Sequence, residues 1–356
     1  MLNSFLADPR RRNLAILGAV AVVAVLLALL ALDARQNEVA PRYRAEQFFP
    51  DLAAHEREVS RIRVASKKGT FDIVFKPYRG WVLPARDDYP ASFDQVKETI
   101  IGLGALQTVE PKTARADWLP AVGLGAPPQG NGVEIALLND KGETLAALIV
   151  GKSEDIGDPG GAIGLFVRKP DSNQSWLVKS VFEPKSDPSD WIEKHVMDVD
   201  RARIQETDVD PAGSASYEVR REQPSDPDFK VTDLPAGRAL ADDTAADGVA
   251  AAITDFSFDD VRAAKNFDFN DAARVITKTF DGLTVTVQTI RQGADYWATV
   301  SAEAGPGKPD AAREARDIDA HVNGWAFKLP DFKGQLFTTP LENLLKPLGA
   351  KPAPAP

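Results

Sequence analysis

The stretch VEIALLNDKGETLAALIV, residues 133–150, contains two short apolar runs on either side of a turn. The runs cover residues 133–138 and 144–150, and each has the length and the branched apolar side chains of a β-strand. The segment NDKG between them is typical of a two-strand hairpin. The stretch therefore predicts an antiparallel β-hairpin, and the patterns on either side of it indicate what the hairpin belongs to.

Further strand patterns lie on both sides of this hairpin. They cover VSRIRV (59–64), TFDIVFK (70–76), LFVR (165–168) and SWLVK (175–179), and Gly69 suits a turn between the first two. Ser92 predicts a helix start with Gln95 completing a capping box, and the helical face consists of Phe93, Val96, Ile100 and Leu103. The segment SDPSDWIEKHV (186–196) predicts a short helix that begins at a proline.

The second half of the chain repeats the first at an offset of about 140 to 150 residues. VITKTFDGLTVTVQTI (275–290) follows the pattern of residues 133–150, RARIQETDV (201–209) that of the first strand, and residues 244–256 that of the helix, with Val249, Ile253 and Phe256 on one face. We therefore predict an α+β protein of two tandem, duplicated domains, residues 51–199 and 200–347. Each domain is expected to be an antiparallel β-meander with packed helices.

An apolar run near the N-terminus predicts a transmembrane helix over residues 14–32. These nineteen residues carry no charge, and as a helix they reach about 28 Å, close to the thickness of a bilayer core. The expected anchor residues are Leu14, Ile16, Leu17, Val20, Val23, Leu26, Leu30 and Leu32. The run is longer than that of a secretory signal, and LDAR (32–35) is a poor cleavage site, so we favour a retained anchor over a cleaved signal.

The charges beside this run predict how the chain is placed. Arg10, Arg11 and Arg12 should hold residues 1–13 in the cytoplasm, so that the domains are periplasmic and the protein is a single-pass protein of the inner membrane. The reverse topology remains an alternative. Residues 33–50 are expected to form a stalk, and residues 348–356, rich in Pro and Ala, a disordered tail.

The composition excludes several classes of function. The formal net charge is −10 and no basic patch is visible, which argues against binding to nucleic acid. The chain has no cysteine, so it has neither disulfides nor cysteine-ligated metal sites. Its three histidines, His55, His195 and His321, are far apart in the sequence and are expected to be surface or packing residues.

Motifs that suggest chemistry are incomplete. VGKS (150–153) lacks the upstream glycine of a phosphate-binding loop, since Ala146 stands there, and it is expected to form a turn; GLGAPP (123–128) lacks the third glycine of a dinucleotide fingerprint. DVDRARIQETDVD (198–210) lacks the glycine and the closing glutamate of a calcium loop. The paired aspartates at 87–88, 242–243 and 259–260 are expected in turns and caps. We predict no catalytic residue, no cofactor and no metal.

The six tryptophans, at positions 81, 118, 176, 191, 297 and 325, are expected to pack in the core or between the two repeats rather than to bind a ligand. Four of them, at positions 81, 176, 297 and 325, lie in strand-like runs, where a core role is simplest.

The order of these segments resembles a bacterial family of unknown function, DUF4340. The resemblance rests on FFPDLAAHEREVSRIRV, on GWVL followed by YPASFDQVKETIIGLGAL, on VGLGAPP, on LAALIVGKS with GLFVRK, and on SDWIEKHVMDVDRARI, and it covers roughly residues 48–345. The insert GRALADDTAADG (237–248) departs from the repeat. The resemblance implies an envelope component that accompanies an ABC transporter of the gliding-motility type.

Together these features predict a function. We expect a non-enzymatic, membrane-anchored periplasmic accessory or scaffold subunit of such a complex, with membrane lipid and the permease or auxiliary subunits as partners. The alternative is a cell-envelope glycan-binding module, or a hydrolase that uses aspartate carboxylates. That alternative requires a cleft in which carboxylates converge, or an open row of aromatic rings.

Overall fold

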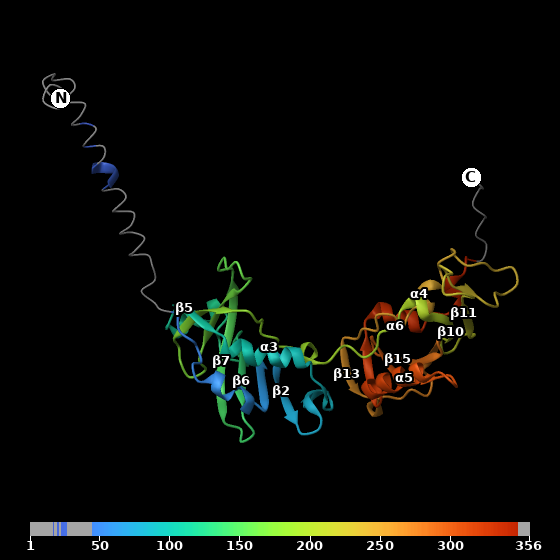
Figure 1. Cartoon of the computed structure of the whole chain (residues 1–356), viewed down its shortest axis with the longest axis horizontal. Helices are drawn as coiled ribbons and strands as arrows, with labels where there is room; N and C mark the ends of the chain where they lie inside the picture. Colours follow the sequence, from blue (N-terminus) through green and yellow to red (C-terminus); the bar gives the residue numbers. More distant parts are fainter. Residues whose placement is uncertain (1–16, 18–19, 21–22, 27–44, 348–356) are drawn as a thin grey trace.

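The computed structural model describes Leu17, Val20, residues 23–26 and residues 45–347. Residues 45–347 form two antiparallel β-sheets, one from each half of the chain, which follow one another along the longest axis of the molecule (Figure 1). Short helices and 3-10 turns connect and cover the strands. Most buried apolar side chains of both halves belong to one continuous core, while Leu119, Leu124 and Ile149 form a small separate cluster.

The first sheet contains nine strands in the order β4-β3-β2-β1-β6-β7-β8-β9-β5. Their bounds are β1 Arg61–Ser66, β2 Gly69–Lys76, β3 Gly80–Leu83, β4 Tyr89–Pro90, β5 Gln107–Pro111, β6 Val133–Leu138, β7 Thr144–Glu154, β8 Ile163–Arg168 and β9 Ser175–Ser180. The accompanying turns and helices are α2 Leu52–His55, η1 Glu56–Glu58, η2 Pro84–Arg86, α3 Phe93–Gly104, η3 Ala116–Val122 and η4 Pro188–Trp191.

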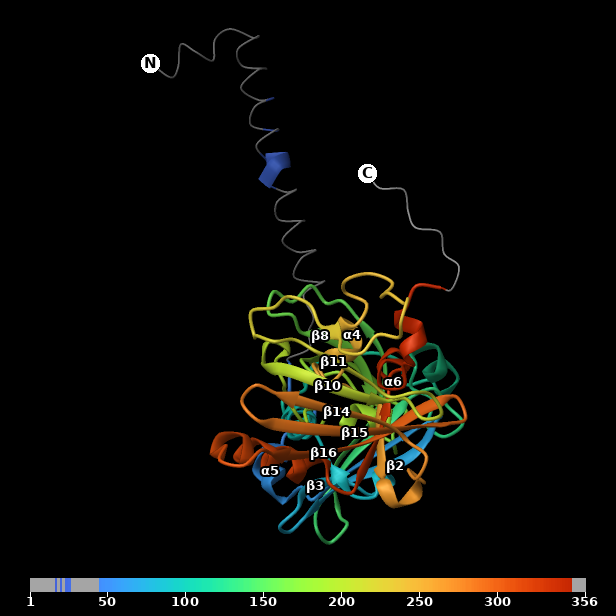
Figure 2. The same ribbon diagram turned by 90° about the vertical axis from the view of Figure 1, so that its right-hand side faces the viewer.

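The second sheet contains eight strands in the order β12-β11-β10-β14-β15-β16-β17-β13. Their bounds are β10 Ile204–Asp210, β11 Tyr217–Arg220, β12 Lys230–Val231, β13 Asp260–Ala263, β14 Ala273–Thr279, β15 Leu283–Gln292, β16 Asp295–Ala304 and β17 Trp325–Leu329. The helices and turns are η5 Arg201–Arg203, α4 Asp247–Ala250, η6 Ala264–Asn266, α5 Pro309–Val322, α6 Asp331–Phe337 and η7 Leu341–Leu344. Figure 2 shows β10, β14, β15 and β16 stacked in this order.

The two sheets share one strand order. When β3, β2 and β1 are matched with β12, β11 and β10, the remaining strands β6, β7, β8, β9 and β5 correspond in order to β14, β15, β16, β17 and β13. Only β4 has no counterpart. This relationship is compatible with an internal duplication, whose boundaries at residues 51, 200 and 347 stay a prediction.

Alternating side chains explain why one face of the second sheet is buried. Along β15, Leu283, Val285 and Val287 are fully buried, while the residues between them are half-buried. Because successive side chains of a strand point to opposite faces, the apolar set points into the core. In α5, Ala311, Ala315, Ile318 and Val322 recur at helical spacing and are buried, and this helix packs on β15 and β16.

The two sheets meet at their edges, where β4 of the first lies against β13 and β17 of the second. The ring of Tyr89 in β4 is buried and makes an edge contact with Trp325, with 5.0 Å between ring centroids. The carboxylate of Asp87 accepts a hydrogen bond of 3.0 Å from the backbone N–H of Ala263. We call these contacts, together with the ion pair between Arg86 and Asp260, the junction.

The predicted fold class is wrong. Residues 45–347 are mostly β-structure in two antiparallel sheets, not the α+β arrangement of meanders with packed helices. Of residues 244–256, only Asp247–Ala250 form an α-helix. Beyond Ala251 the hydrogen bonds shorten to the 3-10 pattern, and Asp255 adopts a left-handed backbone, so the buried Ile253 and Phe256 lie in turns. Residues 186–196 likewise contain only a 3-10 turn, Pro188–Trp191.

The helix predicted after Ser92 is confirmed. It spans Phe93–Gly104, and the hydroxyl of Ser92 accepts a hydrogen bond from the backbone N–H of Gln95. Val96 and Leu103 are buried as expected, but Phe93 is 63% exposed because it occupies the first turn, where the helix extends beyond the core. Neither α5 nor β16 was predicted from the sequence, although both have clear periodicity.

The prediction of a transmembrane helix over residues 14–32 is wrong for the part of the chain that the structure describes. None of the helices there has the length and apolar composition needed to cross a bilayer. Leu17, Val20, Val23 and Leu26 are helical and exposed, whereas Leu14, Ile16, Leu30 and Leu32 lie outside the described residues. The inner-membrane, single-pass localisation with periplasmic domains rested on that helix and is corrected with it.

The predicted stalk, residues 33–50, is described only from residue 45 onward. There it belongs to the fold: Gln47 forms a β-bridge with Gln107, and the backbone N–H of Phe48 donates to the carbonyl of Leu106. The chain thus covers the outer edge of β5. The predicted tails, residues 1–13 and 348–356, lie outside the described residues.

Candidate functional site

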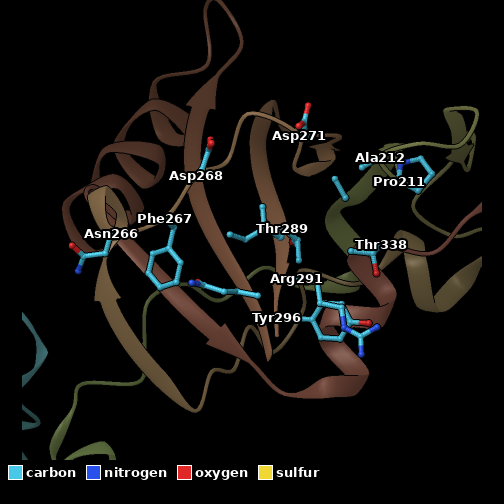
Figure 3. Close-up of a pocket in the computed structure, with 13 residues that line it drawn as sticks. Pro211, Ala212, Asn266, Phe267, Asp268, Asp271, Thr289, Arg291, Tyr296 and Thr338 are labelled. Atoms are coloured by element: carbon cyan, nitrogen blue, oxygen red, sulfur yellow. The ribbon is translucent and has the colours of Figure 1, made fainter. Parts of the chain in front are cut away.

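A pocket of about 660 Å³ lies at one end of the second sheet (Figure 3). Its base is formed where β14 begins and β15 ends. One wall comes from the loop that follows η6, and the other from the start of β16 and the residue after α6. This volume falls within the range of small-molecule sites.

Strand register sets the positions of the pocket residues. Ala273, the first residue of β14, pairs with Thr289 of β15, and Arg291 pairs with Tyr296 across the next hairpin. Gly293 makes the turn of that hairpin with a left-handed φ of 64°, a conformation that glycine adopts without strain. The register therefore places Arg291 and Tyr296 on one side of Thr289 (Figure 3).

Tyr296 is fixed by close contact with α6. A Cβ atom added to Gly334 would lie 2.1 Å from Cγ of the tyrosine ring, so only glycine permits this approach. The guanidinium of Arg291 lies 5.6 Å from the ring centroid, within the range of a cation–π contact. The helix and the arginine therefore hold the ring, and its hydroxyl makes no hydrogen bond with another described residue.

Thr289 is the unusual residue of the pocket. It is 1% exposed and lies on the face of β15 that otherwise carries Leu283, Val285 and Val287. Its hydroxyl has no hydrogen-bond partner among the described protein atoms. Because an unpaired buried hydroxyl costs about 1–3 kcal/mol, this group lowers the stability of the second sheet.

The loop after η6 contributes a ring and two carboxylates to the lining. Phe267 packs against Trp297, with 4.6 Å between ring centroids, on the face of the sheet opposite Thr289 and Tyr296, and this contact holds the loop against the sheet. Asp268 accepts a hydrogen bond of 3.0 Å from the backbone N–H of Asn270, which shapes the loop. Asp271 has no ion pair or hydrogen bond with another described residue.

This arrangement is better suited to binding than to acid catalysis. A glycosidase acid must stay protonated, which enzymes achieve by burying the carboxyl group. Asp268 and Asp271 are both exposed and are only three residues apart in one loop. The two carboxylates therefore lack the environment of an acid–base pair, whereas the donors and acceptors around the pocket can hold a polar ligand.

Some of the paired aspartates predicted in turns lie in turns, and others form contacts across the junction. Asp242 accepts from the backbone N–H of Thr244, as a turn residue should. Asp88 forms an ion pair of 2.6 Å with Lys76. Asp87 and Asp260, in contrast, join the two sheets across the junction, a role that the sequence did not predict.

The three histidines are exposed, which confirms the surface interpretation. His55 contacts Glu58 through its Nδ1, at 2.8 Å. His195 and His321, distant in the sequence, line the same shallow depression beside α5.

The incomplete glycine motifs pack against one another. VGKS is part of β7 rather than a turn, which corrects our expectation. A Cβ on Gly151 would lie 2.3 Å from the carbonyl oxygen of Val122. The close packing of β7 against the start of the GLGAPP loop therefore requires glycine at this position. The backbone N–H groups of Gly130 and Gly132 donate to carbonyls of the same loop, and that of Gly123 donates to the carbonyl of Pro120 in η3. These groups are therefore not free to bind a phosphate.

The tryptophans mostly follow the expected packing roles. Trp191 is fully buried, and Trp325 packs between the two halves against Tyr89. Trp118 contradicts the prediction, because it is 55% exposed on η3, where the guanidinium of Arg115 lies 5.0 Å from its ring.

Three carboxylates of the second sheet form a cluster that the sequence did not reveal. Oxygens of Glu206, Asp208 and Glu218 lie within 4.8 Å of one another. The ammonium group of Lys278 lies 2.5 Å from Glu206 and 2.9 Å from Asp208, and these two hydrogen bonds raise the pKa of the lysine. The lysine supplies the positive charge that a metal ion would otherwise bring.

Comparison with known proteins gives one match. A family model described as a domain of unknown function (DUF4340) matches residues 81–274, which is more than half of the chain. No curated protein and no solved structure matches this sequence.

Proposed function

Since the chain belongs to the DUF4340 family, we propose that it acts as a non-enzymatic accessory or scaffold subunit of an ABC-type transport complex. The transport context comes from the family resemblance. The structural observation that supports a scaffold role is the junction, which joins two sheets of the same strand order into one body with a continuous core.

The junction is suited to hold two binding surfaces at a constant distance. Arg86 and Asp260 are mostly buried, at 13% and 19% side-chain exposure, and the carboxylate of Asp87 accepts a hydrogen bond of 3.0 Å from the backbone N–H of Ala263 across the same junction. Polar contacts that are this directional favour one relative orientation. A scaffold with a fixed orientation can contact two subunits at once, so that each contact raises the effective concentration for the other.

Co-purification tests the proposal. The tagged full-length chain is expressed in cells that naturally produce it, crosslinked there with formaldehyde and purified after detergent extraction. We expect subunits of an ABC-type transporter among the crosslinked proteins. A matched purification with the tag alone controls for background. Repeated recovery of the chain without any transporter subunit would contradict the proposal.

A further inference from the structure

We propose that His195, Asp317 and His321 bind a zinc ion, which joins the segment between the two sheets to helix α5. All three side chains are exposed, and they line one surface depression of about 380 Å³. The inference is independent of the transport role, since it concerns a site on the chain itself. It rests on the course of the connecting segment, on the spacing of the two ligands in α5, and on the hydrogen bond of one ring.

The connecting segment brings His195 to the C-terminal end of α5. The carbonyl oxygen of Glu193 accepts a hydrogen bond of 3.0 Å from the hydroxyl of Tyr89. The ring of Tyr89 in turn contacts Trp325, which begins β17 shortly after the helix ends. Because His195 follows closely after Glu193, it lies near the end of the helix and not near its start.

From there the chain runs back along α5. Arg203 lies further along the chain, and its guanidinium forms hydrogen bonds of 2.8 and 2.6 Å with the carboxylate of Glu314, nearer the start of the helix. The segment and the helix are therefore antiparallel. This direction places His195 beside the last turn of α5, which carries His321, and both residues line the same depression.

Asp317 and His321 have the spacing of two metal ligands on one helix. Residues four apart in an α-helix lie on the same face, with about 5–6 Å between their Cβ atoms. The two histidines of the zinc motif H-E-x-x-H have this spacing for the same reason. The carboxylate of Asp317 has no ion pair or hydrogen bond with another described residue, so it is available to an ion.

The ring of His321 is held in a tautomer that suits a metal ion. Its Nδ1 lies 2.7 Å from the backbone carbonyl oxygen of Asp317. Because a carbonyl oxygen can only accept, Nδ1 carries the proton of the neutral ring, and Nε2 has the lone pair that a metal binds. Histidines that bind metals usually donate their other N–H in this way, which orients the ring.

The remaining groups of the depression favour a cation. Asp198 and Asp317 have no ion pair with another described residue, whereas Asp310 and Glu314 are each paired with an arginine. The ring of His195 has no hydrogen bond with another described residue, so it can turn toward an ion. Two imidazoles and one carboxylate are zinc ligands, and they leave the fourth tetrahedral position to water.

Nitrogen-15 NMR of the imidazole rings tests the site in the full-length chain, which is purified without a histidine tag and titrated with zinc chloride. The chain has three histidines, so each ring can be followed separately. We expect zinc to shift the Nε2 resonance of His321 and a ring nitrogen resonance of His195. The ring of His55, which contacts Glu58 outside the depression, should not respond.

Titration calorimetry measures the contribution of each ligand. His195→Ala, His321→Ala and Asp317→Asn should each weaken zinc binding at least tenfold, since the loss of even an outer partner of a metal site costs about 10- to 100-fold. His55→Ala is the matched control and should leave the affinity unchanged. A hundredfold excess of zinc over its Kd should raise the melting temperature of the wild type by about 4 °C, and that of His321→Ala much less.

Three results would overturn the proposal. The first is that zinc shifts none of the three rings, or shifts all three alike, as nonspecific binding would. The second is that His321 responds and His195 does not, which confines the ion to the helix. The third is that His195→Ala and His321→Ala bind zinc as tightly as His55→Ala. Thermal unfolding shows whether each variant is folded, and the NMR titration of the wild type decides the matter alone if a variant is not.

Discussion

The guanidinium of Arg86 and the carboxylate of Asp260 form an ion pair across the junction, although 174 residues separate them in the chain. The Nε–Oδ1 distance is 2.5 Å, and Arg262 approaches the same carboxylate oxygen at 3.4 Å. Both members of the pair are mostly buried, so solvent screens them weakly. The pair therefore contributes to the stability of the junction more than an exposed pair would.

Replacement of Arg86 by methionine should lower the free energy of unfolding by about 1–2 kcal/mol, because Asp260 loses its main partner while Arg262 retains a weaker contact. Chemical denaturation measures the change. Arg115→Met is the matched control, since Arg115 and Asp117 form an exposed pair at 65% and 61% side-chain exposure and should lose less than about 0.5 kcal/mol. Equal losses in the two variants would show that the junction pair is no stronger than a surface pair.

Two buried threonines of the second sheet should respond to valine in opposite directions. Thr289→Val removes an unpaired hydroxyl and should raise the free energy of unfolding by about 1 kcal/mol in the absence of ligand. Thr207→Val removes a hydroxyl that donates a hydrogen bond of 3.0 Å to the carbonyl of Ala250. This change should lower the free energy of unfolding by about 1 kcal/mol or more. Thermal unfolding of the two variants beside the wild type checks the signs. A loss of stability in Thr289→Val would mean that its hydroxyl has a permanent partner.

Asp187 should contribute to acid sensitivity. Hydrogen bonds from the backbone N–H and the hydroxyl of Ser189, together with the ammonium of Lys68, hold the pKa of Asp187 below its usual value. A carboxyl with a lowered folded-state pKa stabilises the protein above its unfolded pKa of about 3.8, and this contribution is lost as the pH falls through the folded value. Asp187→Asn cannot titrate. Between about pH 5 and about pH 2, the wild type should therefore lose more stability than the variant, as measured by denaturation at each pH.

We expect Lys278 to neutralise the repulsion among the three clustered carboxylates in the absence of a metal ion. Lys278→Met leaves Glu206, Asp208 and Glu218 without the nearby ammonium and should destabilise the fold by roughly 1 kcal/mol, since the side chain is partly exposed. Millimolar calcium should then raise the melting temperature of the variant but not of the wild type.

The control for this variant is Lys328→Met, which removes a lysine that pairs with the single carboxylate of Asp295. It should show no response to calcium, because one carboxylate is too few to hold the ion. A calcium response in the wild type would contradict the role given to Lys278.

The hairpins could be predicted from the sequence because their signals are local. Strand alternation and a turn lie within residues 133–150 and 275–290, and the structure has β6–β7 and β14–β15 there. The capped start of α3 depends on Ser92 and Gln95 alone. Residues 244–256 show where prediction from local patterns fails. The apolar spacing predicts a helix, but Ile253 and Phe256 lie in turns and are buried there by tertiary packing.

The junction and the pocket could not be predicted, because each depends on residues that only the fold brings together. Nothing near Arg86 in the sequence indicates Asp260, and nothing near Phe267 indicates Tyr296. One signal was present: Thr289 follows Leu283, Val285 and Val287 at the same alternation, so a polar residue on the buried face was visible. Its lack of a partner required the structure.

The most direct test of the proposed accessory role is the reciprocal purification. The tag is placed on the ATP-hydrolysing subunit of the candidate transporter, and the amount of this chain that co-purifies without crosslinking is measured against that subunit by quantitative mass spectrometry. The proposal predicts a constant ratio of the two proteins across preparations and a lower ratio for Arg86→Met, whose junction is weakened. Absence of the chain from the purified transporter, or a ratio that varies freely between preparations, would contradict it.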